Sequence, residues 1–140
     1  MLDPAFSIGE ICKSYSADYE LNCDLQEGLQ VRFDKTHFYQ IITNILQNAM
    51  DACETRSYIG IKMHRDKSFV IISIKDLGCG IPSEDLPRIF EPYFSRKNKG
   101  TGLGLALVKR LCEANDTIVR AKSKPGEGSE FTLIIPEASS

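Results

Sequence analysis

The sequence predicts an α+β fold in which a mixed sheet carries helices on one face. Short segments rich in β-branched residues alternate with two strongly amphipathic helical segments, and such interleaving is typical of a sheet covered by helices. The chain has 140 residues and no internal repeat or low-complexity tract. We therefore expect residues 1–140 to form a single domain around one core.

The composition excludes several classes of protein. The 17 basic and 19 acidic side chains leave a net charge of -2, and 42% of the residues are hydrophobic, so neither a disordered chain nor a strongly basic nucleic-acid-binding protein fits. No apolar run approaches the ~18 residues of a membrane span, and the N-terminal residues do not resemble an export signal. We therefore expect a cytoplasmic domain that contacts neither nucleic acid nor membrane.

The five cysteines are odd in number, widely spaced and without a C-x-x-C pair. This pattern indicates reduced thiols rather than a disulfide framework or a metal site. Because free cysteine is among the most buried residue types, we expect each one to be a small buried hydrophobe and not a reactive group.

The first quarter of the chain is expected to contain one helix and two strands. Ser7 is the expected N-cap of a helix at 7–17, with Glu10 completing a capping box. Strands are expected at 19–25 and 29–33, on either side of a glycine turn.

A long amphipathic helix begins after Asp34. Its apolar positions recur at three- and four-residue spacing, the period of a helix about five turns long. This spacing predicts that one side of the helix is buried against the sheet. The apolar stripe consists of Phe38, Ile41, Ile42, Ile45, Leu46, Ala49 and Cys53.

The rest of the chain is expected to add four strands and two helices. Alternating or β-branched residues indicate the strands, and a strongly apolar segment indicates the second long helix. The expected strands are 58–63 and 69–75, paired as a hairpin, with 117–123 and 130–135, and the expected helices are 83–89 and 103–114.

Three polar side chains share one flank of the first long helix. Asn44, Asn48 and Asp51 are spaced by four and three residues, which places them together beside the apolar stripe. Short oxygen ligands at the rim of a core suit Mg²⁺, which takes one or two protein ligands and completes its shell with waters and substrate phosphates. A solvated polar helix face is the alternative interpretation.

An acidic residue directly follows the strand at 69–75. The alternation that buries the β-branched residues of this strand also turns Asp76 toward the core. Gly78 and Gly80 follow, and glycines let the backbone approach a ligand closely. A planar ligand with an exocyclic amine would satisfy the carboxylate, and a simple cap of the turn is the alternative.

A glycine-rich segment leads into the second long helix. Gly100, Gly102 and Gly104 expose backbone amides at a helix N-terminus, which is a position that binds anions, and three basic residues within 96–99 precede them. These features favour a phosphate clamp, with a solvated basic loop as the alternative. The glycine spacing is neither that of a P-loop nor that of a Rossmann turn.

Five motifs, in order, resemble those of sensor histidine kinases. They are the N box at 44–49, the G1 box at 76–81, the F box at 90–94, the G2 box at 100–105 and the G3 segment at 126–131. Each motif alone is weak, but the ordered set lies in a core at 34–136, about three quarters of the chain. The chain thus resembles the ATP-binding catalytic domain of the gyrase, Hsp90, histidine kinase and MutL superfamily.

The resemblance implies a two-layer α/β sandwich of the Bergerat type, in which three helices cover one face of a mixed, mostly antiparallel sheet. It implies ATP and Mg²⁺ as ligands. Asn48 resembles the Mg²⁺ ligand, and Asp76 resembles the acceptor of the adenine amino group. The other residues that the resemblance places around the nucleotide are Asp51, Gly78, Gly80, Ile81, Phe90, Phe94, Gly100, Thr101, Gly102, Leu103, Gly104, Leu105, Ser129 and Thr132.

Two catalytic positions are also implied by the resemblance. Lys97 is similar to a γ-phosphate contact in an ATP lid that the two F-box phenylalanines anchor. Asn44 stands where gyrase, Hsp90 and MutL relatives have the glutamate that activates water, so we expect ATP to be handed on rather than hydrolysed. Asp51 departs from the basic residue that many relatives carry, which argues against a phosphate contact there.

The expected activity is that of a protein-histidine kinase, which delivers the γ-phosphoryl group of Mg-ATP to a histidine on a separate helical dimerisation domain and so, indirectly, to a response regulator. His37 and His64 lack the acidic residue and nearby proline of a family H box. The phosphoacceptor and sensor domains are therefore expected outside this chain. An anti-sigma-type serine kinase and a non-catalytic nucleotide-binding module are the alternatives.

Overall fold

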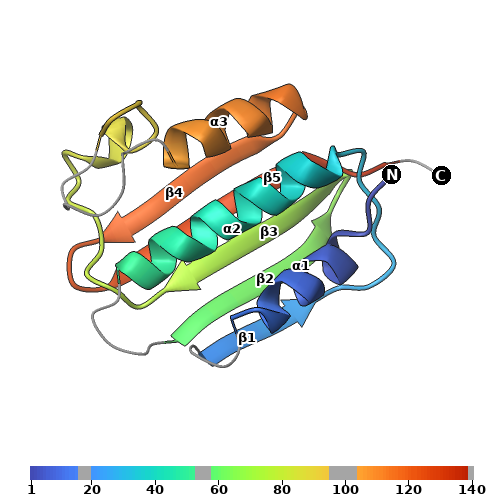
Figure 1. The fold of residues 1–140 in the computed structure, drawn as a ribbon, viewed down its shortest axis with the longest axis horizontal. Helices are drawn as coiled ribbons and strands as arrows, with labels where there is room; N and C mark the ends of the chain where they lie inside the picture. Colours follow the sequence, from blue (N-terminus) through green and yellow to red (C-terminus); the bar gives the residue numbers. More distant parts are fainter. Residues whose placement is uncertain (16–19, 53–57, 95–103, 139–140) are drawn as a thin grey trace.

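The computed structural model describes residues 1–15, 20–52, 58–94 and 104–138. Within them, a sheet with the strand order β1-β2-β3-β5-β4 carries helices α1, α2 and α3 on one face (Figure 1). This two-layer arrangement confirms the predicted α+β fold. The strands are β1 (Glu20–Leu25), β2 (Tyr58–Asp66), β3 (Phe69–Asp76), β4 (Ile118–Lys124) and β5 (Gly128–Pro136), and the helices are α1 (Pro4–Lys13), α2 (Lys35–Asp51) and α3 (Gly104–Ala114).

The sheet is mixed, as the sequence predicts. β1 pairs in parallel with β2, whereas β2 with β3, β3 with β5 and β4 with β5 pair antiparallel. The hairpin of β2 and β3 is confirmed, although both strands run further than the sequence pattern indicates. The parallel edge strand β1 needs a crossover connection, and α2 lies on that connection.

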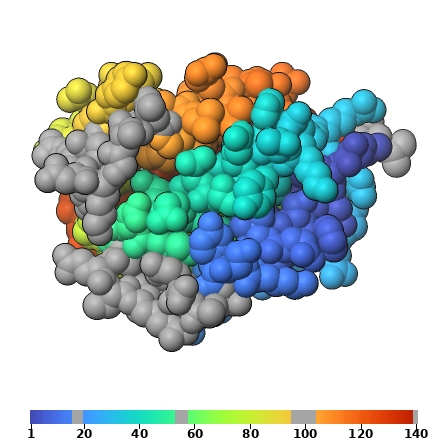
Figure 2. All heavy atoms as spheres, in the orientation of Figure 1, coloured from blue at the N-terminus to red at the C-terminus, as the bar shows by residue number. Residues whose placement is uncertain are grey.

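The core lies between the sheet and α2. Asp34 caps this helix, because its side chain accepts a hydrogen bond from the His37 amide at 2.9 Å. Figure 2 shows α2 in the middle of the helical layer, with α1 on one side and α3 on the other. The buried side chains of α2 are Phe38, Ile41, Ile42, Ile45, Leu46, Ala49 and Met50, while Cys53, at the end of the predicted stripe, lies outside the described residues.

The predicted start of the N-terminal helix is wrong. α1 begins at Pro4, and Asp3 is its N-cap, with the Asp3 carboxylate accepting a hydrogen bond from the Phe6 amide at 3.2 Å. Aspartate is a strong N-cap, and proline suits the first helical position because its missing N–H has no partner there. The helix also ends earlier than expected, at Lys13.

The predicted strand at 29–33 is also wrong. Val31 makes only isolated bridges, one with Leu2 and one with Glu137, and Leu29 and Val31 are buried. The alternation in this segment therefore reflects burial of a connecting chain that runs between the N-terminal and C-terminal residues. The expected helix at 83–89 shortens to a 3₁₀ turn at Leu86–Arg88, where a proline withholds one backbone donor.

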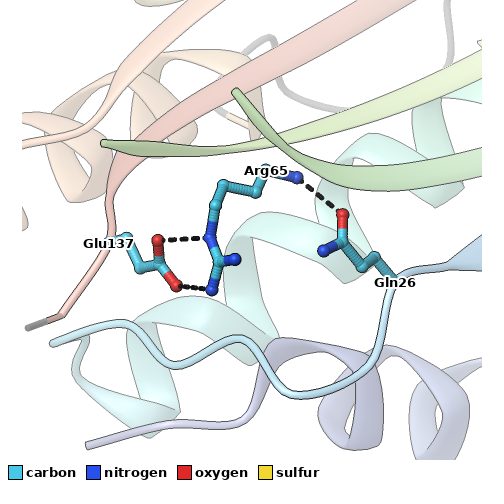
Figure 3. Close-up of polar contacts among 3 residues, drawn as sticks. All are labelled: Gln26, Arg65 and Glu137. Atoms are coloured by element: carbon cyan, nitrogen blue, oxygen red, sulfur yellow. Dashed lines mark hydrogen bonds and ion pairs between the residues drawn. The ribbon is translucent and has the colours of Figure 1, made fainter. Parts of the chain in front are cut away.

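A polar cluster joins the end of β2 to the C-terminal segment (Figure 3). The Arg65 guanidinium donates two hydrogen bonds to the Glu137 carboxylate, at 2.7 and 2.6 Å, and the Arg65 amide donates to Gln26 Oε1 at 3.0 Å. The hydrogen bonds from Arg65 lower the pKa of Glu137. The bidentate pair joins β2 to the C-terminal segment, and the separate contact with Gln26 adds the segment that follows β1.

None of the helices in the described part of the chain is long and apolar enough to span a bilayer.

Truncation of the α2 stripe should destabilise the fold. Ile45 is fully buried, so Ile45→Ala should lower the free energy of unfolding by about 2–5 kcal/mol through lost burial and the cavity left behind. Urea denaturation would measure the loss. Gln47→Ala, an exposed position on the same helix, is the control and should stay within about 0.5 kcal/mol of wild type. Equal effects of the two changes would contradict the packing described above.

Candidate functional site

A cavity of about 450 Å³ opens where the C-terminal end of α2 meets the segments that follow β3 and precede β5. A volume of this size suits a small-molecule ligand. Most of its wall is apolar, with a few polar side chains among the apolar ones. The lining residues are Asn48, Asp51, Ala52, Cys79, Gly80, Ile81, Pro82, Asp85, Ile89, Phe94, Leu105, Pro125 and Ser129.

Asp76 lies beside this cavity, at the last position of β3, and is only 1% exposed. Its Oδ1 atom accepts hydrogen bonds from the Gly78 amide at 2.8 Å and from the Ser129 amide at 3.3 Å. Ser129 is on the cavity wall and Asp76 is not. The inward direction predicted for this carboxylate is therefore observed, and two backbone amides hold it in place.

Two glycines around Asp76 have no room for a side chain. A Cβ atom on Gly78 would lie 2.5 Å from the Ala52 carbonyl oxygen, at the end of α2. Gly128 has a φ of 91°, which L side chains rarely adopt, and a Cβ there would collide with the Asp76 carbonyl. These contacts bring the turn after β3 against both α2 and the start of β5.

Ser123, at the end of β4, links the two turns that border the cavity, and the sequence did not signal it. Its hydroxyl donates to the Gly128 carbonyl at 2.7 Å, accepts from the Ile81 amide at 2.7 Å and lies 3.0 Å from the Ser129 hydroxyl. β4, β5 and the segment that follows β3 thus contribute to one polar network behind the cavity. A lone serine in an alternating strand carries no sequence pattern that predicts this role.

Of the three polar residues that the sequence places on one flank of α2, only two line the cavity. Asn48 and Asp51 line the cavity, and Asp51 also accepts a hydrogen bond from Gln47 at 3.1 Å. Asn44 is not on the cavity wall; its amide donates to the Gln40 carbonyl at 2.7 Å, and its Oδ1 lies 3.1 Å from the point where a Cβ on Gly104 would sit. Asn44 therefore borders the start of α3.

The polar residues on the cavity wall suit a metal ion that takes only one or two ligands from the protein. Asn48 is half-buried and lines the cavity, and the described residues contain no group of three or more His, Cys, Asp or Glu side chains that could hold a metal ion. Mg²⁺ takes one or two protein ligands and completes its shell with phosphates and waters. A magnesium site here would depend on the bound substrate.

The two F-box phenylalanines have different positions. Phe94 lines the cavity, and the Arg88 guanidinium lies 5.1 Å from its ring centroid, a distance typical of a cation–π contact. Phe90 instead packs edge-to-face on Phe131, with the ring centroids 6.3 Å apart. Phe90 thus anchors this segment to the sheet, whereas Phe94 faces the ligand space.

Only part of the predicted phosphate clamp lies within the described residues. Leu105, in the first turn of α3, lines the cavity, and Gly104 begins that helix. Predictions also fall on five residues outside the described ranges, namely Lys97, Gly100, Thr101, Gly102 and Leu103.

The structure brings Ser129 to the cavity but not Thr132. The Thr132 hydroxyl lies 3.4 Å from the Ser73 hydroxyl, on the sheet face that the helices leave open. Side chains alternate between the two faces of a strand, so residues three apart in β5 point in opposite directions. The assignment of Thr132 to the pocket was therefore wrong.

Several residues of the cavity wall are not among those predicted from the sequence. Asp85 is 2% exposed and lines the cavity, yet it belongs to a Ser-Glu-Asp run that is typical of a solvated turn. Cys79 and Pro82 lie in or directly after the predicted G1 box and could have been inferred from it. Pro125 lies in the turn before β5, next to the predicted G3 segment.

Residues 33–139 match the family of histidine kinase-, DNA gyrase B- and HSP90-like ATPases. The chain belongs to this ATPase family. Among curated relatives, this ATPase domain is 37% identical over 127 residues to the sensor-like histidine kinase SenX3 of Mycobacterium tuberculosis, which covers 86% of the chain and 31% of SenX3. The signal transduction histidine-protein kinase AtoS of Escherichia coli is 42% identical over 107 residues, an alignment that covers 76% of this chain and 18% of AtoS. The domain thus spans less than a third of the length of these relatives.

Solved structures show the same fold. The mycobacterial sensor histidine kinase MprB superposes with a TM-score of 0.89 at 22% identity, covering 99% of this chain and 97% of that one. The catalytic domain of histidine kinase ThkA gives a TM-score of 0.87 at 26% identity, and the match covers 97% of this chain and 93% of the ThkA domain. Full-length ShkA in complex with AMPPNP gives 0.87 at 25% identity, covering 99% and 31%.

Removal of the Ser123 hydroxyl should loosen the cavity wall of this ATPase domain. Ser123→Ala leaves the Ile81 amide without its partner, so the free energy of unfolding should fall by about 1–3 kcal/mol. Urea denaturation would measure the change. Ser73→Ala removes only the longer contact on the open sheet face and should change stability by less than about 0.5 kcal/mol. A larger loss in the Ser73 variant would refute the assigned network.

Proposed function

We propose that this chain is the ATP-binding catalytic domain of a two-component sensor histidine kinase. The observation that carries the proposal is the buried Asp76 carboxylate, held by the Gly78 and Ser129 amides beside a cavity of ligand size. Family membership and the relatives named as histidine kinases support it. Within this role, residues 1–140 are one domain that works in the cytoplasm.

Recognition of adenine is assigned to the inner end of the cavity. Asp76 accepts a hydrogen bond from the exocyclic amine of the base, directly or through a water molecule, because a carboxylate is a strong acceptor and the amine is a donor. The apolar side chains of Ile81, Ile89 and Phe94 on the cavity wall suit the faces of a planar base. Gly80 has a φ of 76°, and a Cβ atom there would collide with the Lys124 carbonyl, so glycine lets this part of the cavity wall pack against the end of β4.

The triphosphate is assigned to the side of the cavity that faces α2 and the start of α3. Asn48 would hold Mg²⁺, which when bound neutralises charge on the phosphates and orients the γ-phosphoryl group. Lys97 and the amides at 100–105 are assigned as further phosphate contacts. Transfer would then depend on positioning and electrostatic stabilisation more than on covalent chemistry by the protein.

Hydrolysis is disfavoured in this proposal because no carboxylate occupies the position of Asn44. The Asn44 amide donates to the Gln40 carbonyl, and an amide cannot serve as a general base for water. We therefore assign the γ-phosphoryl group to a histidine on the helical dimerisation domain of the same kinase, and from there to a response regulator. In this proposal, neither the phosphoacceptor domain nor the response regulator is formed by residues 1–140.

Phosphotransfer tests the proposal directly. With Mg²⁺ and γ-labelled ATP, the chain should label a purified phosphoacceptor domain of its own kinase, and the label should be lost in acid because phosphohistidine is acid-labile. An acceptor domain with its histidine replaced by glutamine is the control and should stay unlabelled. An acid-stable label would identify a serine kinase instead. Tight ATP binding without transfer would favour a non-catalytic nucleotide-binding module.

Substitution of the buried acid tests the adenine pocket. Asp76→Asn should weaken binding of both ADP and ATP by about 10- to 100-fold, because a charged acceptor contributes roughly 1.5–3 kcal/mol. Calorimetric titration would measure both affinities, and thermal melts would check folding. Thr132→Ala, on the open sheet face, is the control and should bind as wild type does. Wild-type ADP affinity in a folded Asp76→Asn variant would place the base elsewhere.

A further inference from the structure

Two cysteines face each other on the far side of α2 from α3, away from the nucleotide cavity. Cys12 belongs to α1 and Cys23 to β1, the edge strand that α1 covers (Figure 1). Their sulfur atoms lie 3.7 Å apart, in hydrogen-bond contact. Cys12 is buried and Cys23 is exposed. Neither residue lines the cavity.

This placement differs from the sequence expectation that every cysteine is buried and inert. That expectation holds for Cys112, where burial raises the pKa of the thiol to about 12. It fails for Cys23, which is exposed and whose pKa is lowered by the hydrogen-bond contact between its sulfur and that of Cys12. A lowered pKa increases the share of thiolate at neutral pH, and the thiolate is the reactive form of a cysteine.

The geometry points to Cys12 and Cys23 as a thiol pair that reacts with peroxide-class oxidants and closes into a disulfide between α1 and β1. Cys23 is the attacking residue because it is exposed, and Cys12 is the resolving residue because it lies buried against Cys23. The sulfurs need to approach by less than 2 Å to reach the ~2 Å of an S–S bond. The proposal is independent of the proposed kinase activity.

The chemistry balances with hydrogen peroxide as the only co-reactant. The Cys23 thiolate attacks one peroxide oxygen, the O–O bond breaks, and the products are Cys23 sulfenic acid and hydroxide, which takes up a proton to become water. The Cys12 sulfur then attacks the Cys23 sulfur, forming the S–S bond and releasing a second water with the Cys12 proton. Two thiols are oxidised, and one peroxide is reduced to two waters.

The first step prepares the second one. The pKa of Cys12 is raised first by its hydrogen bond with Cys23, then by its own burial, and last by the charge on the Cys23 thiolate. Conversion of the thiolate into a neutral sulfenic acid removes the two influences that come from Cys23 and leaves only that of burial, so Cys12 can lose its proton more readily as it attacks. The completed bond would tie α1 to an edge strand that is paired on one side only, and should thus restrict local opening of this edge.

The test is oxidation of the reduced chain with one equivalent of hydrogen peroxide. We expect loss of two thiols, a mass decrease of two hydrogen atoms, and one cross-linked peptide pair containing Cys12 and Cys23. The Tm should rise by about 5 °C, and dithiothreitol should reverse every change. Wild-type protein in which Cys12 and Cys23 remain reduced while other thiols react would overturn the proposal, as would a cross-link from either residue to a different cysteine.

Single variants separate the two roles. Cys12→Ser should leave Cys23 as a sulfenic acid that dimedone traps, with no rise in Tm, whereas Cys23→Ser should lose both the cross-link and the trapped product. Cys79→Ser, which removes another exposed thiol, is the matched control and should retain the cross-link. Because Cys12 is buried and its variant can be unstable, differential alkylation of wild type provides a second readout. Slower alkylation of Cys23 than of Cys79 would contradict the proposal.

Discussion

Burial of the Asp76 carboxylate is the constraint on which the organisation of the site depends. A carboxylate that is 1% exposed is costly unless hydrogen-bond donors surround it. The amides of Gly78 and Ser129 meet this requirement only when the turn after β3 and the first residues of β5 lie together. Gly78 also lies against the Ala52 carbonyl, so the same constraint draws in the end of α2.

The sheet register carries this constraint across three strands. Asp76 pairs with Ser129 between β3 and β5, and Ser129 pairs with Ser123 between β5 and β4. The Ser123 hydroxyl then holds the Ile81 amide on the cavity wall. A ladder of backbone hydrogen bonds is rigid, so a site built on strand ends is held more precisely than one built on loops alone. The ligand space is thus a product of sheet register and of α2 packing.

Local patterns account for most elements, because periodicity reports directly on burial. The stripe of α2 and the β2–β3 hairpin could be predicted for this reason. Residues 29–33 do not form the predicted strand, because alternate burial does not require a neighbouring strand. The assignment of Thr132 to the pocket rested on motif resemblance, which does not report the face of the strand on which a side chain lies. Asp85 could not be predicted, because nothing in a short polar run distinguishes a buried acid from a solvated one.

The sequence by itself determined the two-layer fold, the ATPase family and the order of the motifs, since each depends on residue type and short-range spacing. Tertiary structure alone decided which side chains share the cavity, because contacts between β3, β4, β5 and α2 join residues up to 81 positions apart (48–129). It also decided that Cys12 and Cys23 meet. A helix packed on an edge strand can pair two thiols whose spacing in the sequence predicts no contact.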